Sequence, residues 1–181
     1  MGVTSFIAIL LLAIILSFCI IFFYALIISQ QIGVPFVPTR TKDLARIFSY
    51  VKLSTSDIFY DLGCGNGSVV FFAAEHFQAQ CIGIELNKIL YALCLFRKKH
   101  FEKTHTTQFF HEDLYATHLK QATVVYFFLY PEIVAQLTNR LLAECKKNTL
   151  IISHGFKIKG WSKKRVHTIT KGYFKTYFYR V

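Results

Sequence analysis

The chain has 181 residues, of which 54% are hydrophobic and 17% charged, and its formal net charge is +11. Soluble domains have about 45–50% apolar and about 25% charged residues, so a purely soluble, disordered or fibrous protein is excluded. The apolar excess is confined to one N-terminal stretch, which also excludes a transporter with several membrane spans.

The N-terminal stretch Phe6–Ile28 carries no charged side chain. As a helix it would be about 35 Å long, enough for a hydrocarbon core of about 30 Å. We predict one transmembrane helix, with residues 1–33 as the anchor and residues 34–181 as a separate domain. A cleaved signal peptide is the alternative, but the stretch is too long and no Lys or Arg precedes it. Arg40, Lys42 and Arg46 follow the span, so the positive-inside rule predicts a single-pass membrane protein with its domain on the cytoplasmic side, or the equivalent side of an organelle.

The cysteines and histidines give no sign of a cross-link or a metal centre. The five cysteines form no Cys-x-x-Cys pair, and one of them, Cys19, lies inside the predicted span. The seven histidines lack the spacing of metal ligands. We therefore predict reduced thiols and no metal.

Strand and helix patterns alternate through the rest of the chain. The predicted helices are a short one over 41–51 that Thr41 caps, then 68–77, 88–99, and one that Pro131 opens and residues 146–148 close. The predicted strands are 58–61, 80–85, 108–111, 123–129, 150–153, 165–170 and 173–181. Because no helix separates the last two strands, we expect an α/β, Rossmann-like, mostly parallel seven-stranded sheet with an antiparallel C-terminal hairpin.

A glycine-rich loop, Asp61-Leu62-Gly63-Cys64-Gly65-Asn66-Gly67, follows the first strand. Glycines there allow a sharp turn into a helix and a close approach of backbone to a ligand. Glu85 ends the next strand, where a carboxylate can accept both hydroxyls of a ribose. Asp113, after the third strand, can accept from the exocyclic amine of an adenine. Three acids at successive strand ends indicate a nucleoside ligand.

Two cofactors fit such a loop, a nicotinamide dinucleotide and S-adenosylmethionine. Asp61 would repel a pyrophosphate but attract a ligand that carries an ammonium and a sulfonium. A glycine turn that binds nothing, with Asp61 capping the loop, is the alternative. The pattern favours S-adenosylmethionine.

The glycine motif, Glu85, Asp113 and the closing hairpin resemble those of class I, seven-β-strand S-adenosylmethionine-dependent methyltransferases. The span, Pro35-Phe36-Val37-Pro38-Thr39 and Phe156–Trp161 are similar to membrane-anchored protein-lysine methyltransferases of the ATP synthase c-subunit and adenine nucleotide translocase type, and to their bacterial relatives. The sequence departs from the pattern of that family at two places. Asn66 stands where the family often has Asp, and residues 157–160 are more basic than the proline-rich segment expected there. The resemblance implies a lysine acceptor and adds Pro38 and Thr39 to the site. The predicted cofactor-binding residues are Pro38, Thr39, Asp61, Gly63, Cys64, Gly65, Asn66, Gly67, Glu85, Asp113 and Leu114.

The end of the fourth strand is where a methyl acceptor would arrive. Tyr130 and Glu132 are the predicted catalytic residues there, although Tyr130 packing on the core and Glu132 compensating the helix dipole are alternatives. The Asn/Asp-Pro-Pro-aromatic signature of enzymes that methylate adenine or amide nitrogen is absent from the sequence at this strand end. His154, after the fifth strand, is interpreted as a surface or hydrogen-bonded core residue rather than a base.

Positive charge is concentrated at the C-terminal end of the chain. After Glu144 there are ten Lys and Arg residues and no acid. An anionic lipid surface, RNA and plain solvent are the three candidate environments, and the predicted span favours lipid over nucleic acid. We predict a membrane-protein substrate, with a phospholipid headgroup, RNA, or a non-catalytic cofactor-binding scaffold as alternatives.

Overall fold

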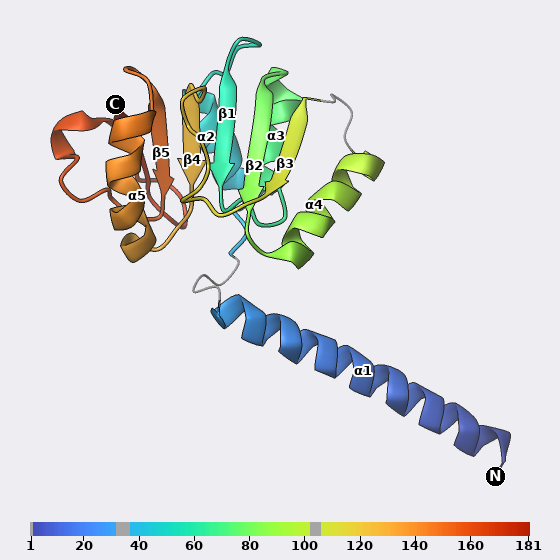
Figure 1. The fold of residues 1–181 in the computed structure, drawn as a ribbon. Coiled ribbons are helices and arrows are strands. Elements are labelled where there is room, and N and C mark those ends of the chain that lie inside the picture. The colour runs from blue at the N-terminus through green and yellow to red at the C-terminus, as the bar shows by residue number, and fades with distance from the viewer. Residues whose placement is uncertain (1, 32–36, 102–105) are drawn as a thin grey trace. The chain divides into compact units, whose positions relative to one another are not determined.

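The computed structural model describes residues 2–31, 37–101 and 106–181 (Figure 1). The chain divides into two compact units, residues 1–36 and residues 37–181. The predicted boundary between residues 33 and 34 lies outside the described residues, as do Pro35 and Phe36. The first unit contains helix α1 (Val3–Gln31), in which Thr4–Tyr24 is long and apolar enough to cross a membrane, by length and composition.

The second unit is built on one seven-stranded sheet, in the order β3-β2-β1-β4-β5-β7-β6. Strands β1 to β5 are parallel, and β7 runs antiparallel to both β5 and β6. The strands are β1 (Ile58–Leu62), β2 (Gln80–Glu85), β3 (Thr107–His111), β4 (Val124–Phe127), β5 (Leu150–His154), β6 (Arg165–Ile169) and β7 (Thr176–Arg180). The predicted fold, including the C-terminal hairpin, is confirmed.

Among the described residues of the second unit there are also four α-helices and a short 3₁₀ turn, η1 (Ser162–Lys164). The helices are α2 (Thr41–Tyr50), α3 (Ser68–Phe77), α4 (Lys88–Phe101) and α5 (Pro131–Glu144). The prediction that Thr41 caps α2 is wrong. Arg40 is the N-cap residue, because its extended backbone directs its carbonyl to the N–H groups of Asp43 and Leu44, and Thr41 is already helical.

Alternate residues along each strand contribute to two separate hydrophobic cores, as strand geometry requires. Phe59 and Tyr126 face the core that α2 and α3 cover, and Tyr60 and Phe127 face the core that α5 covers. In Figure 1, α5 lies in front of the sheet and α2 and α3 lie behind it. The near-continuous apolar strands 58–62 and 124–127 are therefore buried on both faces.

The strand order reverses at β1, whose neighbours are β2 on one side and β4 on the other. Helices α3 and α4 follow β1 and β2, whereas α5 follows β4 and covers the opposite face. In doubly wound sheets a ligand binds at the carboxyl ends of the strands, next to such a reversal. A ligand-binding site is therefore expected at the carboxyl end of β1.

His154, the last residue of β5, is a core residue. Its side chain is buried, its Nδ1 lies 2.8 Å from Thr176 Oγ1, and its ring packs against Phe128 and Phe174. The interpretation of His154 as a hydrogen-bonded core histidine is confirmed.

Burial lowers the pKa of His154 to about 4, despite the opposing effect of Asp43. Below about pH 6.5 the unfolded chain gains a proton that the folded chain does not bind. The free energy of unfolding should therefore fall by up to about 3 kcal/mol between pH 6.5 and pH 4. Urea unfolding in detergent at several pH values measures this, and His154→Gln should flatten the acid limb. An unchanged slope in the variant contradicts the assignment.

Candidate active site

The glycine loop between β1 and α3 is folded tightly against the end of β2. The N–H groups of Gly63 and Cys64 both donate to the Ile84 carbonyl at 2.9 Å, and Gly67 donates to the Cys64 carbonyl. Gly67 begins α3 with φ +74°, and a Cβ on it would lie 2.9 Å from the Phe109 ring. Only glycine satisfies both conditions. Gly63 and Gly65 also adopt positive φ, a backbone conformation that residues with side chains rarely take.

Glu85 fastens the loop to the start of α4. Its Oε2 accepts from the Gly65 N–H at 2.7 Å, and its Oε1 accepts from the Asn87 N–H at 2.8 Å. The residue is 8% exposed, and burial raises the pKa of Glu85, although the N–H groups that it binds oppose the shift. A carboxylate has about four acceptor positions, so each oxygen keeps room for a ribose hydroxyl.

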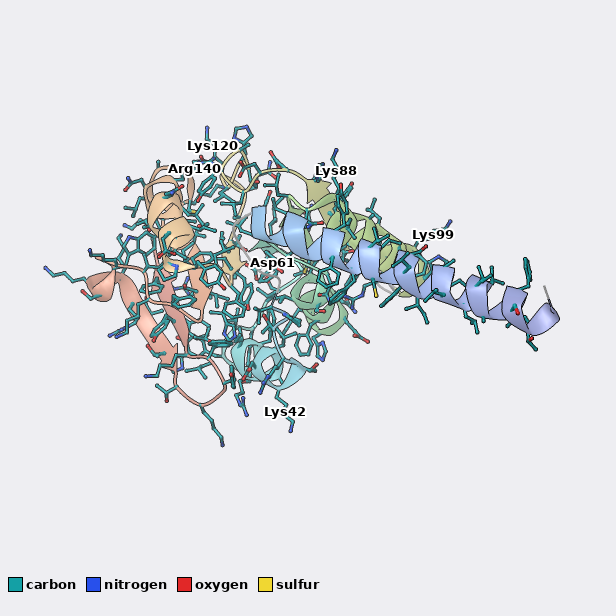
Figure 2. The ribbon with its side chains drawn as sticks, turned by 90° about the horizontal axis from the view of Figure 1, so that it is seen from below. Lys42, Asp61, Lys88, Lys99, Lys120 and Arg140 are labelled. Atoms are coloured by element: carbon teal, nitrogen blue, oxygen red, sulfur yellow. The ribbon has the colours of Figure 1, made fainter. Side chains whose placement is uncertain are left out.

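Asp61 is the most unusual residue of the site. It is 1% exposed, and its Oδ2 has no hydrogen-bond partner among the residues that the structure describes. Burial, and then the charge of Glu85, raise the pKa of Asp61 well above its usual value. Figure 2, seen from the edge at which the parallel strands end, shows Asp61 in the middle of the domain. A buried carboxylate without a partner is costly, and a cationic ligand group would remove that cost.

The residues after the first unit reach this site through Thr39. Thr39 Oγ1 lies 2.9 Å from the Tyr126 hydroxyl, and Tyr126 is opposite Asp61 in the β1–β4 register. Pro38 is exposed immediately before it. The structure thus brings Thr39 to the site, through a tyrosine that the sequence analysis did not identify.

Two predicted loop residues direct their side chains away from a ligand. The Cys64 sulfur would lie 2.8 Å from a Cβ on Gly83, so it packs down onto β2. Its contact with Cys94, together with burial, raises the pKa of Cys64 well above its usual value. Asn66 Oδ1 accepts from the N–H and the hydroxyl of Ser68 and holds the start of α3. The Cys64 backbone is engaged as well, through its N–H with Ile84 and its carbonyl with Gly67.

The third strand brings Asp113 and Leu114 to the neighbourhood of Glu85. The Glu112 N–H donates to the Glu85 carbonyl at 3.3 Å, which joins the ends of β3 and β2. Asp113 is exposed and its Oδ1 accepts from the Tyr115 N–H at 2.9 Å, while Leu114 is half-buried. One Asp113 oxygen therefore has its capacity left for a ligand.

Tyr130 and Glu132 lie beyond the end of β4, at the start of α5. Leu129, the residue before Tyr130, packs 3.1 Å from where a Cβ on Gly63 would be, so this chain segment borders the glycine loop. The Tyr130 side chain is 37% exposed, with its ring centroid 6.2 Å from that of Phe156. Glu132 is exposed in the first turn of α5.

Helix α4 supplies two loop contacts that the sequence analysis missed. Cys94 Sγ donates to the Gly65 carbonyl at 3.2 Å, and Arg97 Nη1 donates to the Asn66 carbonyl and, at 3.3 Å, to Ser68 Oγ. The Arg97 guanidinium also lies over the Phe71 ring, 4.8 Å from its centroid. Arg97 lies near the end of the predicted helix 88–99, but the direction of its side chain could not be predicted from the sequence.

Comparison with known proteins agrees with this geometry. The family model described as the ANTKMT methyltransferase domain matches residues 61–165. The chain belongs to this family. A protein-lysine N-methyltransferase of Saccharolobus islandicus is 34% identical over 142 residues, which cover 77% of this chain and 87% of that protein. The ATP synthase c-subunit lysine N-methyltransferase of Xenopus laevis is 29% identical, over 73% of this chain and 58% of that protein.

Solved structures of methyltransferases share the fold. An RNA methyltransferase of Salinibacter ruber, in complex with S-adenosylhomocysteine, superposes with a TM-score of 0.76 at 26% identity, over 80% of this chain and 94% of that chain. A Geobacter sulfurreducens methyltransferase with the same product superposes with a TM-score of 0.57 at 18% identity, over 65% and 49%. The chain is an S-adenosylmethionine-dependent methyltransferase. The orphaned Asp61 carboxylate and the open glycine loop fit an ammonium-bearing nucleoside.

Binding of S-adenosylmethionine should be coupled to ionisation of Asp61. Since the pKa of Asp61 is raised in the empty protein, the carboxyl must lose its proton to pair with the cofactor ammonium. Affinity should then fall by up to about tenfold per pH unit below that pKa. Calorimetry in buffers of different ionisation enthalpy measures the released proton.

Asp61→Asn provides the test of this coupling. It should abolish the proton release and weaken binding, yet raise the free energy of unfolding of the ligand-free protein at pH 8, because the raised pKa of Asp61 lowers stability at every pH above the pKa of the unfolded carboxyl. Glu75→Gln, at an exposed carboxylate on α3, is the matched control and should change neither. If Asp61→Asn leaves the proton release unchanged, Asp61 does not carry the coupling.

Glu85→Ala should weaken S-adenosylmethionine binding by about 1.5–3 kcal/mol, the loss for a hydrogen bond to a charged group. Because Glu85 also holds the N–H groups of Gly65 and Asn87, some thermal stability should be lost as well. Gly65→Val should abolish binding by covering the loop backbone. Calorimetry on the full chain in detergent measures all three proteins, and native affinity in either variant contradicts the site.

Proposed function

We propose that this protein methylates the ε-amine of a lysine in a membrane protein, close to the membrane surface. The main support for a lysine acceptor is the 34% identity over 142 residues with a protein-lysine N-methyltransferase. Relatives named for the ATP synthase c-subunit and, at 23% identity, for the adenine nucleotide translocase of mouse add membrane-protein acceptors. The chain covers 58% of the length of these last two, so the class of acceptor, not its identity, is proposed.

Membrane anchoring is the second part of the proposal. Residues 1–33 form the anchor, Phe6–Ile28 crosses the bilayer, and residues 34–181 form the methyltransferase domain. The length and composition of α1 support this. Arg40, Lys42 and Arg46 follow the span and support a cytoplasmic or equivalent organellar location of the domain.

The cofactor is proposed to occupy the edge at which β1 to β4 end. Asp61 pairs with its ammonium, Glu85 accepts from the ribose, Asp113 and Leu114 border the adenine, and Thr39 closes the site beside Tyr126. The loop backbone at residues 63–67, with Pro38 next to Thr39, completes the binding surface. The buried, partnerless Asp61 oxygen is the strongest support.

When bound, S-adenosylmethionine supplies a methyl group on a sulfonium that leaves as a neutral thioether. The lysine nitrogen forms the new N–C bond as the C–S bond breaks, so the protein must hold a deprotonated amine in line. Tyr130 follows β4 and Phe156 follows β5, and their ring centroids lie 6.2 Å apart. We call this part of the surface the rim, and Tyr130 is proposed to border the acceptor lysine there together with Phe156. Glu132 is proposed to attract the lysine. Removal of water at the rim lowers the pKa of the amine.

A second acceptor class, RNA, has one specific observation in its favour. The Salinibacter ruber structure is that of an RNA methyltransferase, and the net charge of +11 suits a polyanion. The same charge suits anionic lipid, and α1 favours the membrane. The labelling experiment below therefore distinguishes lysine from RNA and from phospholipid headgroups as the methyl acceptor.

The acceptor is identified by following labelled methyl groups. The purified full chain is incubated with membranes and methyl-labelled S-adenosylmethionine, and the expected label is methyl-lysine in protease-sensitive material. Label extracted with lipid would assign the headgroup instead, and label in nuclease-sensitive material would assign RNA. The variant Gly65→Val is the control without a cofactor site.

Removal of residues 1–33 tests the anchor separately. The shortened protein should retain nearly native S-adenosylmethionine affinity, which also checks that it folds. It should methylate membrane acceptors far more slowly, because tethering raises their effective concentration, and high salt should slow it further. Equal rates with and without the anchor would remove anchoring from the proposal.

A further inference from the structure

Helix α4 leaves several large apolar side chains exposed. Leu86, just before the helix, and Ile89, Leu93 and Phe96 within it are 46%, 54%, 40% and 54% exposed. Positions 89, 93 and 96 follow the i, i+4, i+7 spacing that places side chains on one face of a helix. These four residues, here called the α4 stripe, form a continuous apolar strip on the outer surface.

The inner side of α4 is the side that serves the active site. Cys94 is fully buried, and with Arg97 it binds the carbonyl groups of the glycine loop. The α4 stripe lies on the opposite side, so the glycine-loop contacts do not account for it. Helix α4 thus has apolar side chains on both sides, since Tyr91 and Cys94 pack against the core, whereas an amphipathic helix of a soluble domain has them on the inner side.

Positive charge borders the α4 stripe. Lys88 is exposed at its start and Lys99 near its end (Figure 2). Lys98, in the last turn of the helix, donates to the Thr107 carbonyl instead. Aliphatic and aromatic side chains bordered by lysines are typical of helices that lie in the headgroup region of a membrane.

We propose that α4 docks onto the membrane surface through the α4 stripe, with Lys88 and Lys99 against anionic lipid headgroups. This contact is separate from the α1 span and from the basic C-terminal region. It rests on the anchoring part of the proposed function and is independent of the methyl acceptor.

The length of the chain supports a lipid rather than a protein occupant. Only residues 29–36 separate Ile28 from Val37, the first residue of the second unit. Even fully extended, they reach about 30 Å, so the anchor holds the domain at the membrane surface. Four side chains, each about half exposed, offer far less area than the ~800 Å² per partner of a stable protein interface, but apolar area and charge act together on a lipid surface.

Docking through α4 would set the orientation of the active site. The Asn87 N–H donates to Glu85, and Asn87 Oδ1 accepts from the Ile89 N–H at 2.9 Å and caps α4. Leu86 directly follows Glu85, so the α4 stripe starts one residue from the proposed ribose-binding carboxylate. A membrane in contact with the α4 stripe would therefore lie near the rim where a lysine at the bilayer surface has to enter.

Fluorescence quenching by brominated lipids in vesicles tests the contact on the full chain. Three variants each carry one added tryptophan: Ile89→Trp on the α4 stripe, Phe18→Trp in α1, and Leu142→Trp near the end of α5, at a side chain that is 43% exposed. The native Trp161 is 4% exposed, and its emission is subtracted with the unmodified protein. We expect quenching at positions 18 and 89 in vesicles of phosphatidylcholine and phosphatidylglycerol, and none at 142.

The outcomes separate this inference from the proposed anchoring. Quenching at 18 without quenching at 89 overturns the α4 contact and leaves the anchor intact, whereas no quenching at 18 overturns the anchor. Quenching at 89 should decrease in vesicles of phosphatidylcholine alone and in high salt. If the residue at 89 instead becomes shielded from acrylamide in detergent as protein concentration rises, the occupant is a second copy and the lipid proposal is wrong.

A charge-neutral change in the α4 stripe completes the test. With the probe moved to Leu86→Trp, the added changes Ile89→Gln and Leu93→Gln should abolish quenching by lipid. Leu142→Gln, at a leucine on α5 that is 43% exposed, is the matched charge-neutral control and should leave quenching unchanged. S-adenosylmethionine affinity in detergent should stay native in both proteins, which confirms that they fold, and undiminished quenching in the glutamine variant contradicts the proposal.

Discussion

Two buried carboxylates at the ends of adjacent strands govern the arrangement of this site. Glu85 is stabilised by backbone N–H groups from the glycine loop and from the start of α4. Asp61 lies under the same loop with one oxygen unsatisfied among the described residues. Burial, and then the charge of Glu85, make ionisation of Asp61 unfavourable. The empty protein therefore carries an unfavourable interaction that a cationic nucleoside relieves, and the site is built around that ligand before it arrives.

The glycine loop is positioned from several sides, which explains its shape. Ile84 holds it from β2, Glu85 binds its central N–H, and Cys94 and Arg97 bind its carbonyl groups from α4. Its glycines allow left-handed backbone, but glycine alone would leave the loop free to move. The surrounding hydrogen bonds supply the order that the loop residues lack. Helix α4 thus has a structural task on its inner side and exposed apolar surface on its outer side.

Much of the fold was readable from residues because the signals were local. Runs such as 58–62 and 124–127 are apolar on both faces, as a central parallel strand must be, and Pro131 starts α5 as predicted. Helix starts were less secure, since Thr41 has the right chemistry for a cap but the backbone of Arg40 takes that position. Exposed Asp113 and Glu132 were also readable as acids at strand or helix ends, but the residues that Asp113 binds were not.

The sequence by itself determined the fold class, the glycine loop, the acids at the strand ends and the apolar N-terminal stretch, because spacing along the chain encodes them. Only the tertiary structure decided that one Asp61 oxygen lacks a partner among the described residues, that the Cys64 sulfur packs onto β2, that Tyr126 meets Thr39, and that Ile89 and Leu93 of α4 are exposed. Those facts depend on which way side chains point and on residues distant in the chain, such as the 87 positions that separate Thr39 from Tyr126. Local periodicity does not encode side-chain direction or contacts between distant residues, because both depend on how the helices and strands pack together.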